Sequence, residues 1–148
     1  MKFLNPTIHG YTDYLFSAFL LLAPTFFDFG GTPAALCYGF GVVQLTMSLI
    51  TRYPMGALKW IPFPVHGGCE VAVAILLAAS PWVFNFAALD APRNLFVVGG
   101  LALFGVWFVT DYRRLGIDAV ARHDRTRLAA TTPFPDGVRY GHRTRDAA

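Results

Sequence analysis

The sequence predicts an all-α, polytopic membrane protein with four transmembrane helices arranged as two repeated helical hairpins. Two observations lead to this prediction. Hydrophobic residues make up 55% of the 148 positions and charged residues only 14%, whereas soluble domains carry about 25% charged residues. In addition, the two halves of the hydrophobic region match each other residue by residue, which indicates an internal duplication.

Four windows are long and apolar enough to cross a bilayer core of about 30 Å, which requires roughly 20 mostly apolar residues in a helix. They cover residues 8–27, 33–51, 65–84 and 94–110. The second and fourth windows are clean, whereas the first and third each contain a histidine and an acid near their starts. We therefore expect the first turns of these two helices to lie at the membrane interface.

The internal repeat is carried by polar as well as apolar positions. Residues 8–29 align without gaps on residues 65–86, and SLITRY (48–53) later lies against WFVTDY (107–112). Repeat one thus covers about 8–53 and repeat two about 65–112, within a membrane domain of residues 1–112. Each repeat contains two helices, so both copies enter the membrane from the same side, which implies a pseudo-twofold axis along the membrane normal. The matched pairs are His9 with His66, Asp13 with Glu70, Pro24 with Pro81, and Asp28 with Asn85.

The basic residues predict the orientation. Eight of the 12 Lys and Arg residues lie in residues 113–148, and Lys2, Arg52 and Lys59 lie before the first window or between the second and third. Only Arg93 lies in the two remaining connections. By the positive-inside rule, both termini and the middle loop face the cytoplasm. We expect a multi-pass protein of a bacterial or archaeal inner membrane.

Residues 113–148 form a basic cytoplasmic tail, which we expect to be partly amphipathic and then extended or disordered. Its arginines lack interleaved aromatic residues, so the tail does not indicate nucleic-acid binding. We expect it to make cytoplasmic contacts.

Ser80-Pro81-Trp82 closes the third window, and Asn94 opens the fourth, followed shortly by VVGG (97–100). These features resemble the SPW-repeat family of small integral membrane proteins, whose repeat is a two-helix unit with this signature at the end of its first helix. In the first half only Pro24 of the signature is present. The resemblance implies architecture and location but no reaction. We interpret the tripeptide as a helix-ending device, with Trp82 in the outer interfacial belt.

His9 and Asp13 are separated by one helical turn, as are His66 and Glu70. If both pairs face the pseudo-twofold axis, two imidazoles and two carboxylates converge and can bind zinc or iron; haem binding or proton handling are further possibilities. The alternative interpretation is structural. The acids then lie in the first turn, near the positive end of the helix dipole. The histidines cap helices or lie at the interface, and Arg52 pairs with one of the acids.

Gln44 is the main polar residue in the middle of the second window, and we expect it to form a hydrogen bond between helices. Cys37 and Cys69 lie toward opposite membrane faces, so a disulfide between them is not expected.

No catalytic constellation is evident, so we expect no enzyme and no cofactor. The first hypothesis is a non-catalytic integral membrane protein that serves as a structural, assembly or accessory component of a membrane complex. Its partners are then the lipid bilayer and other membrane subunits or further copies of itself. The second hypothesis is a metal- or haem-binding membrane protein that uses the paired His and carboxylate residues. The third is transport of a small solute or protons.

Overall fold

The computed structural model describes residues 4–112. The predicted amphipathic and extended tail lies outside the described residues. Residues 4–112 form an all-α fold without a sheet, and two isolated β-bridges complete it. The helices are α1 (Pro6–Phe26), α2 (Gly31–Ile50), α3 (Phe63–Val83) and α4 (Asp90–Val109).

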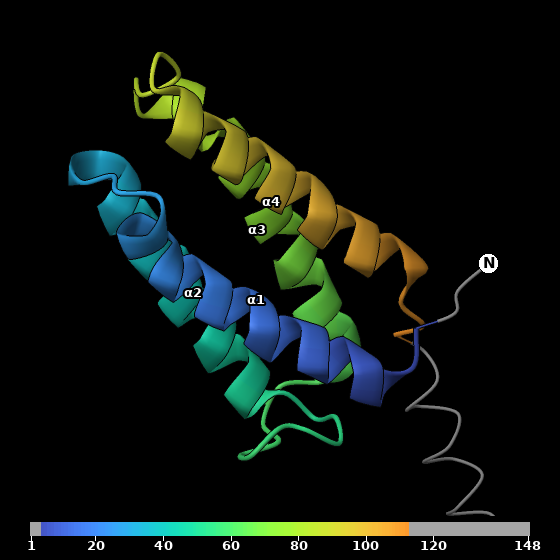
Figure 1. Cartoon of the computed structure of the whole chain (residues 1–148). Helices are drawn as coiled ribbons and strands as arrows, with labels where there is room; N and C mark the ends of the chain where they lie inside the picture. The colour runs from blue at the N-terminus through green and yellow to red at the C-terminus, as the bar shows by residue number, and fades with distance from the viewer. Residues whose placement is uncertain (1–3, 113–148) are drawn as a thin grey trace, which may run out of the picture. The chain divides into compact units, whose positions relative to one another are not determined.

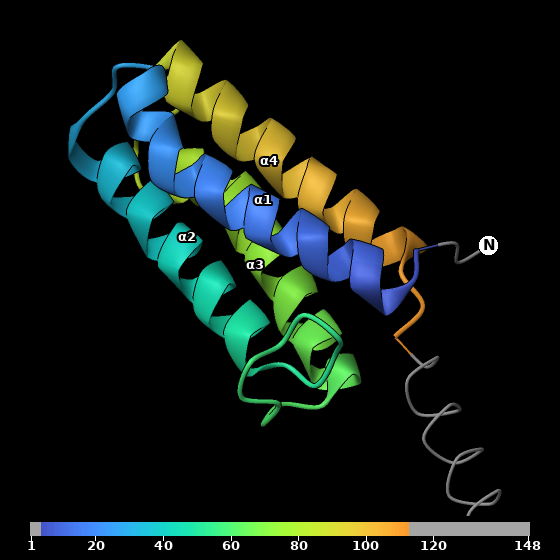
Figure 2. The ribbon, with the colours of Figure 1, turned by 60° about the horizontal axis from the view of Figure 1, so that its bottom comes forward.

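The four helices form two hairpins (Figures 1 and 2). Helix α1 packs along α2, α3 packs along α4, and α2 also contacts α3. The start of α1, the end of α4 and the loop between α2 and α3 lie at one end of the molecule, whereas the two hairpin turns lie at the other. We call these the loop end and the turn end.

Helices α1 and α3 begin two residues before the windows that hydropathy indicates. Asn5 caps α1, because its Oδ1 accepts hydrogen bonds from the backbone N–H groups of Thr7 at 3.0 Å and Ile8 at 2.9 Å. A proline lies in the first turn of both helices, where its missing N–H costs nothing. The two acids, Asp13 and Glu70, therefore lie beyond the first turn. The expectation that the helix dipole positions them is wrong.

The ends of α1 and α3 share one stop mechanism. Asp28 and Asn85 adopt left-handed backbone conformations, with φ of 49° and 58°. Beyond them, the N–H of Phe29 donates to the Pro24 carbonyl at 3.1 Å, and the N–H of Phe86 donates to the Pro81 carbonyl at 2.9 Å. This is the pattern of a Schellman cap, in which Asn and Asp tolerate the left-handed position.

Ser80-Pro81-Trp82 thus lies in the last turns of α3. Ser80 Oγ donates to the Leu76 carbonyl at 2.6 Å, and Pro81 is buried inside the helix. Trp82 is exposed. Asn85, and not the proline itself, makes the turn that ends the helix.

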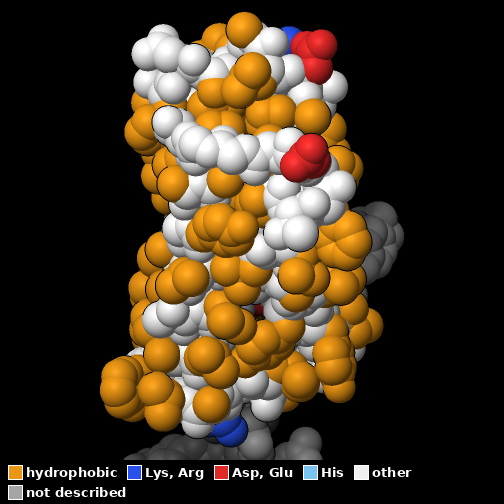
Figure 3. Space-filling model, turned by 60° about the vertical axis from the view of Figure 1, so that its left-hand side comes forward, with side chains coloured by type: hydrophobic (Ala, Val, Ile, Leu, Met, Phe, Trp, Pro, Cys, Tyr) orange, Lys and Arg blue, Asp and Glu red, His pale blue; other side chains and the backbone are white. Residues whose placement is uncertain are grey.

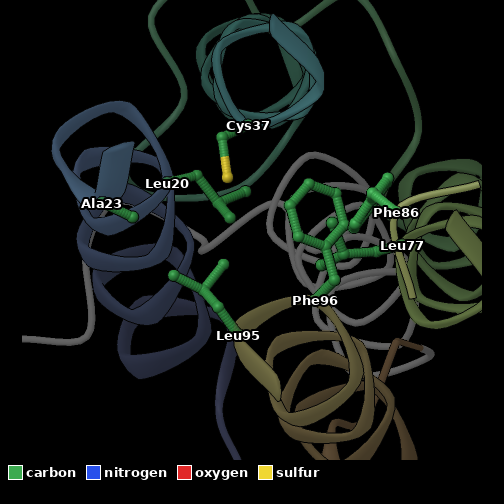
Figure 4. Close-up of a cluster of buried hydrophobic side chains, with 7 residues drawn as sticks. All are labelled: Leu20, Ala23, Cys37, Leu77, Phe86, Leu95 and Phe96. Carbon is green, nitrogen blue, oxygen red and sulfur yellow. The ribbon is translucent and has the colours of Figure 1, made fainter. Parts of the chain in front are cut away.

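Toward the turn end, apolar side chains from all four helices form the main core (Figure 4). Cys37 belongs to this core and is a free thiol. Cys69 is free and exposed. The buried core residues are Leu20, Ala23, Cys37, Leu77, Phe86, Leu95 and Phe96.

The outside of the bundle is apolar. Large side chains such as Leu15, Phe26 and Phe108 are exposed by 62–79%. Figure 3 shows a mostly hydrophobic face, with acidic side chains in its upper part and a basic one at its lower end. Helices α2, α3 and α4 are long and apolar enough to cross a membrane. A surface of this kind belongs in lipid.

Candidate metal centre

Four ionisable side chains, one histidine and one acid from each of α1 and α3, meet near the loop end. His9 Nε2 lies 3.4 Å from His66 Nε2, 3.3 Å from Asp13 Oδ2 and 3.5 Å from Glu70 Oε2. His66 Nε2 lies 3.3 Å from Asp13 Oδ2. None of the four residues exposes more than 1% of its surface. Both imidazole nitrogens and the Asp13 oxygen thus surround one point inside the protein, and Glu70 Oε2 approaches it from the side of His9.

Two threonines determine which nitrogen of each histidine faces that point. Thr110 Oγ1 lies 3.0 Å from His9 Nδ1, and Thr51 Oγ1 lies 2.9 Å from His66 Nδ1. Both hydroxyls donate their own hydrogen to a carbonyl one turn earlier, Val106 at 2.6 Å and Met47 at 2.5 Å. Each threonine oxygen must therefore accept a hydrogen from Nδ1, which leaves a lone pair on Nε2 in the neutral ring.

Two tyrosines hold the acids. The Tyr112 hydroxyl donates to Glu70 Oε2, and the Tyr53 hydroxyl donates to Asp13 Oδ2 over 3.5 Å. Burial, reinforced by the neighbouring carboxylate, raises the pKa of both phenols well above the usual range. Both tyrosines therefore remain protonated donors at physiological pH.

The two acids differ in their second oxygen. Gln44 of α2 donates through Nε2 to Asp13 Oδ1 at 3.3 Å. The matching position in the second half is Leu103, which has no donor. Glu70 Oε1 is the buried side-chain oxygen without a hydrogen-bond partner in residues 4–112. Such an atom is costly unless it faces a cation or a proton.

Two isolated β-bridges hold the backbone of the threonines that contact the histidines. Leu4 bridges to Thr110, and Ile61 bridges to Thr51. In each case the chain that enters α1 or α3 pairs with the chain that leaves the other hairpin, at α4 or α2. The two hairpins are therefore joined through the same residues that orient the imidazoles.

Aromatic rings enclose the cluster. The ring centroids of Phe63, Tyr112 and Tyr53 lie 5.3, 5.4 and 6.4 Å from that of His9. A porphyrin held between two histidines needs a wide, flat slot, which is incompatible with these rings and with two Nε2 atoms 3.4 Å apart. The spacing of the donor atoms therefore favours a single ion over a haem.

The donor set suits a small transition-metal ion. Imidazole and carboxylate together bind zinc and iron, and the best sites orient each ligand through a second hydrogen bond. Here a threonine orients each histidine and a tyrosine orients each acid. His9, His66 and Glu70 place their ligand atoms within 4.8 Å of one another, close enough to hold one ion.

The structure brings together His9, Asp13, His66, Glu70 and Gln44, all of which the sequence singled out. The histidines are buried and do not cap a helix. Residues of the SPW signature lie at the turn end, away from the site: Pro24, Ser80, Pro81, Trp82 and Asn94.

Arg52 does not pair with either acid, contrary to the structural interpretation. Its side chain is exposed, and its Nε donates to the Lys59 carbonyl at 2.7 Å. A guanidinium inside the cluster would have to give up its water, whereas the neutral tyrosines reach the acids at lower cost.

Sequence reasoning missed Thr51, Tyr53, Thr110 and Tyr112 as site residues. The signal was present, because the T-x-Y pattern occurs at matching places in SLITRY and WFVTDY. Phe63 has no such signal, since the matching position of the first half is Pro6.

The apolar exterior, the three helices of spanning length and the buried polar cluster define a multi-pass membrane protein. A family model for the SPW repeat domain matches residues 7–111, and the chain belongs to this family. Comparison with curated proteins found no match, and comparison with solved structures found none either.

Proposed function

We propose that this protein is a non-catalytic, multi-pass membrane protein that binds one divalent transition-metal ion, with zinc as the first candidate, between its two hairpins. The ligands are His9, Asp13, His66 and Glu70. The observation that carries the proposal is the convergence of two Nε2 lone pairs and two carboxylate oxygens at 3.3–3.5 Å inside the protein.

The separations among three of the four donor atoms match a tetrahedral ion. Zinc lies about 2.0–2.2 Å from nitrogen and oxygen ligands, and the edge of a tetrahedron is about 1.6 times its centre-to-corner distance, which gives roughly 3.3–3.6 Å. His9 Nε2, His66 Nε2 and Asp13 Oδ2 form a triangle with sides of 3.4, 3.3 and 3.3 Å. Glu70 Oε2 lies 3.5 Å from His9 Nε2 but not within 4.0 Å of His66 Nε2, so we propose that it moves in as the fourth ligand when the ion binds.

Charge supports the same conclusion. Two carboxylates and two neutral imidazoles carry a net charge of −2, which is expensive to bury without compensation. A divalent ion cancels this charge and interacts favourably with every inward-facing lone pair. The alternative is that protons, and not a metal ion, lie between these atoms. Metal analysis of the purified protein distinguishes the two possibilities.

A four-ligand site leaves no open position, which is typical of structural and not catalytic zinc. We infer that the ion stabilises the junction of the hairpins and that the protein acts without a reaction of its own, as an accessory component of a membrane assembly. The basic tail is the part that we expect to make cytoplasmic contacts.

We further propose that α1 is a fourth membrane span and that the hairpins are related by a pseudo-twofold axis along the membrane normal. The exchanged contacts of His9 with Thr110 and of His66 with Thr51 support this symmetry. Lys2, Arg52 and Lys59 support a cytoplasmic position for the loop end in a bacterial or archaeal inner membrane.

The test is metal analysis of protein purified in mild detergent without chelator. We expect about one transition-metal ion per chain and a lower thermal stability after chelation, restored by Zn²⁺. His66→Ala and Glu70→Gln should abolish binding. His123→Ala removes a histidine from the tail and should leave it unchanged.

Substitution with Co²⁺ tests the geometry, because tetrahedral Co²⁺ absorbs visible light much more strongly than octahedral Co²⁺. A folded protein that contains no metal, and whose stability Zn²⁺ does not change, would show that protons occupy the site and would overturn the proposal.

A further inference from the structure

The loop between α2 and α3 has a fixed conformation at the loop end of the molecule. The N–H groups of Ala57 and Leu58 donate to the Leu49 carbonyl at 2.8 and 3.0 Å, and those of Trp60 and Ile61 donate to the Ile50 carbonyl at 2.7 and 2.9 Å. The loop thus satisfies the last carbonyls of α2, which otherwise lack partners. Its backbone is therefore held in a defined arrangement.

Within the described part of the chain, residues 4–112, the two cations of this loop have no acidic partner. Arg52 Nε donates to the Lys59 carbonyl at 2.7 Å, so the guanidinium lies against the backbone of the second cation. Among residues 4–112 the remaining basic residue is Arg93, at the turn end, which pairs with Asp90 at 2.8 Å. Relative to the other described residues, the Arg52–Lys59 pair therefore carries an uncompensated charge of about +2 at pH 7.

Exposed apolar side chains lie on both sides of Lys59. Leu58 is 51% exposed and Trp60 is 67% exposed. An exposed indole is typical of the zone where lipid headgroups meet acyl chains. Cationic and apolar side chains are thus combined on one rigid loop.

We propose that this loop binds the phosphate headgroup of an anionic phospholipid, with Arg52 and Lys59 on the phosphate and with Leu58 and Trp60 in the adjoining acyl region. The remaining guanidinium N–H groups of Arg52 suit phosphate oxygens. A free inorganic phosphate would make no use of the two apolar side chains. The inference is independent of the metal site.

The experiment is native mass spectrometry of the full chain in detergent, titrated with phosphatidylglycerol, with phosphatidylcholine of the same acyl chains, or with inorganic phosphate. Phosphatidylglycerol should bind more tightly than phosphatidylcholine, and phosphate alone should neither bind nor compete. The double variant Arg52→Gln/Lys59→Gln should lose roughly tenfold of this preference, because each basic residue contributes to attraction of anionic lipid.

Arg93→Gln is the matched control, since it removes one cation at the turn end, and it should retain the wild-type preference. Lys59→Gln alone leaves the Arg52 hydrogen bond to the backbone in place. On a logarithmic scale, it should lose about half as much of the lipid preference as the double variant does. The double variant Leu58→Ala/Trp60→Ala should bind both lipids more weakly than the wild type does. Equal binding of the two lipids, an unchanged preference in the double variant, or competition by phosphate would each overturn the proposal.

Discussion

At the scale of single residues, the hydroxyl groups around the cluster determine its chemistry. Thr51 and Thr110 would otherwise be unremarked helix-end residues, yet each fixes the tautomer of a buried histidine by donating one hydrogen and accepting another. If either hydroxyl were absent, the imidazole could move its hydrogen to Nε2 and point a donor at the proposed ion. The threonines therefore keep both Nε2 atoms available as ligands.

Thr51→Val and Thr110→Val test this role, because valine keeps the shape of threonine and removes the hydroxyl. We expect each variant to fold and to bind Zn²⁺ about 10–100-fold more weakly, the usual effect of losing a partner of a ligand. Competition with a chromophoric zinc chelator measures the change.

Ser80→Ala is the control for these variants, since it removes a buried hydroxyl at the turn end that bonds only within α3. It should retain the wild-type affinity. Wild-type affinity in both threonine variants would mean that the histidines need no external orientation.

At the scale of the elements, close packing at the loop end depends on two glycines. A Cβ atom added at Gly67 would lie 2.7 Å from Cε1 of Tyr112, and one added at Gly10 would lie 2.5 Å from Cε2 of Tyr53. The absence of a side chain thus lets each tyrosine reach the acid of its own hairpin. At neighbouring Gly68 nothing lies within 4 Å of an added Cβ.

Gly67→Ala should destabilise the protein by about 1–3 kcal/mol, because the Tyr112 ring must shift and loosen its hydrogen bond to Glu70. Gly68→Ala should be neutral or stabilising by up to about 1 kcal/mol, since alanine favours the helix. Denaturant unfolding in detergent micelles measures both. Equal stabilities for the two variants would contradict the close contact seen here.

The left-handed residue Asn85 at the C-terminal end of α3 leads to a second prediction at this scale. Asn85→Gly should be nearly neutral, whereas Asn85→Ala should cost roughly 1–2 kcal/mol, because a Cβ atom strains the left-handed conformation and alanine lacks the local hydrogen bonding of asparagine. The same unfolding experiment applies. A larger loss for glycine than for alanine would show that the side chain of Asn85 matters more than its backbone angle.

Much of this arrangement could be predicted from the sequence. Hydropathy located all four helices, and the duplicated His-x-x-x-acid spacing singled out four residues that do meet. Contacts made beyond the helix ends could not be predicted, because residues such as His9 and Thr110, 101 positions apart, are joined only by the packing of the hairpins. The pairing assigned to Arg52 failed for a related reason, since depth along the membrane says nothing about the cost of removing water from a guanidinium.

At the scale of the whole molecule, the two hairpins are joined by polar contacts at one end and by an apolar core toward the other. The loop end holds the ionisable cluster and the exchanged bridges, and the core of Leu20, Leu77 and Phe96 lies toward the turn end. A bilayer adds little drive for apolar helices to associate. The buried polar junction is therefore the feature that defines how one hairpin is placed against the other.

The position of this junction in the membrane leads to the last prediction, which tests the number of spans and their direction. Single cysteines are placed in a background with Cys37→Ala and Cys69→Ala and are labelled on intact cells with a membrane-impermeant maleimide. Gly30→Cys and Ala88→Cys, at the two hairpin turns, should react. Ala57→Cys and Lys2→Cys should react only after the cells are permeabilised, because the four spans that we propose place the N-terminus and the α2–α3 loop in the cytoplasm. Labelling of Lys2→Cys from outside, with Ala57→Cys still protected, would show that α1 does not cross the membrane, and the site would then lie between a surface helix and three spans.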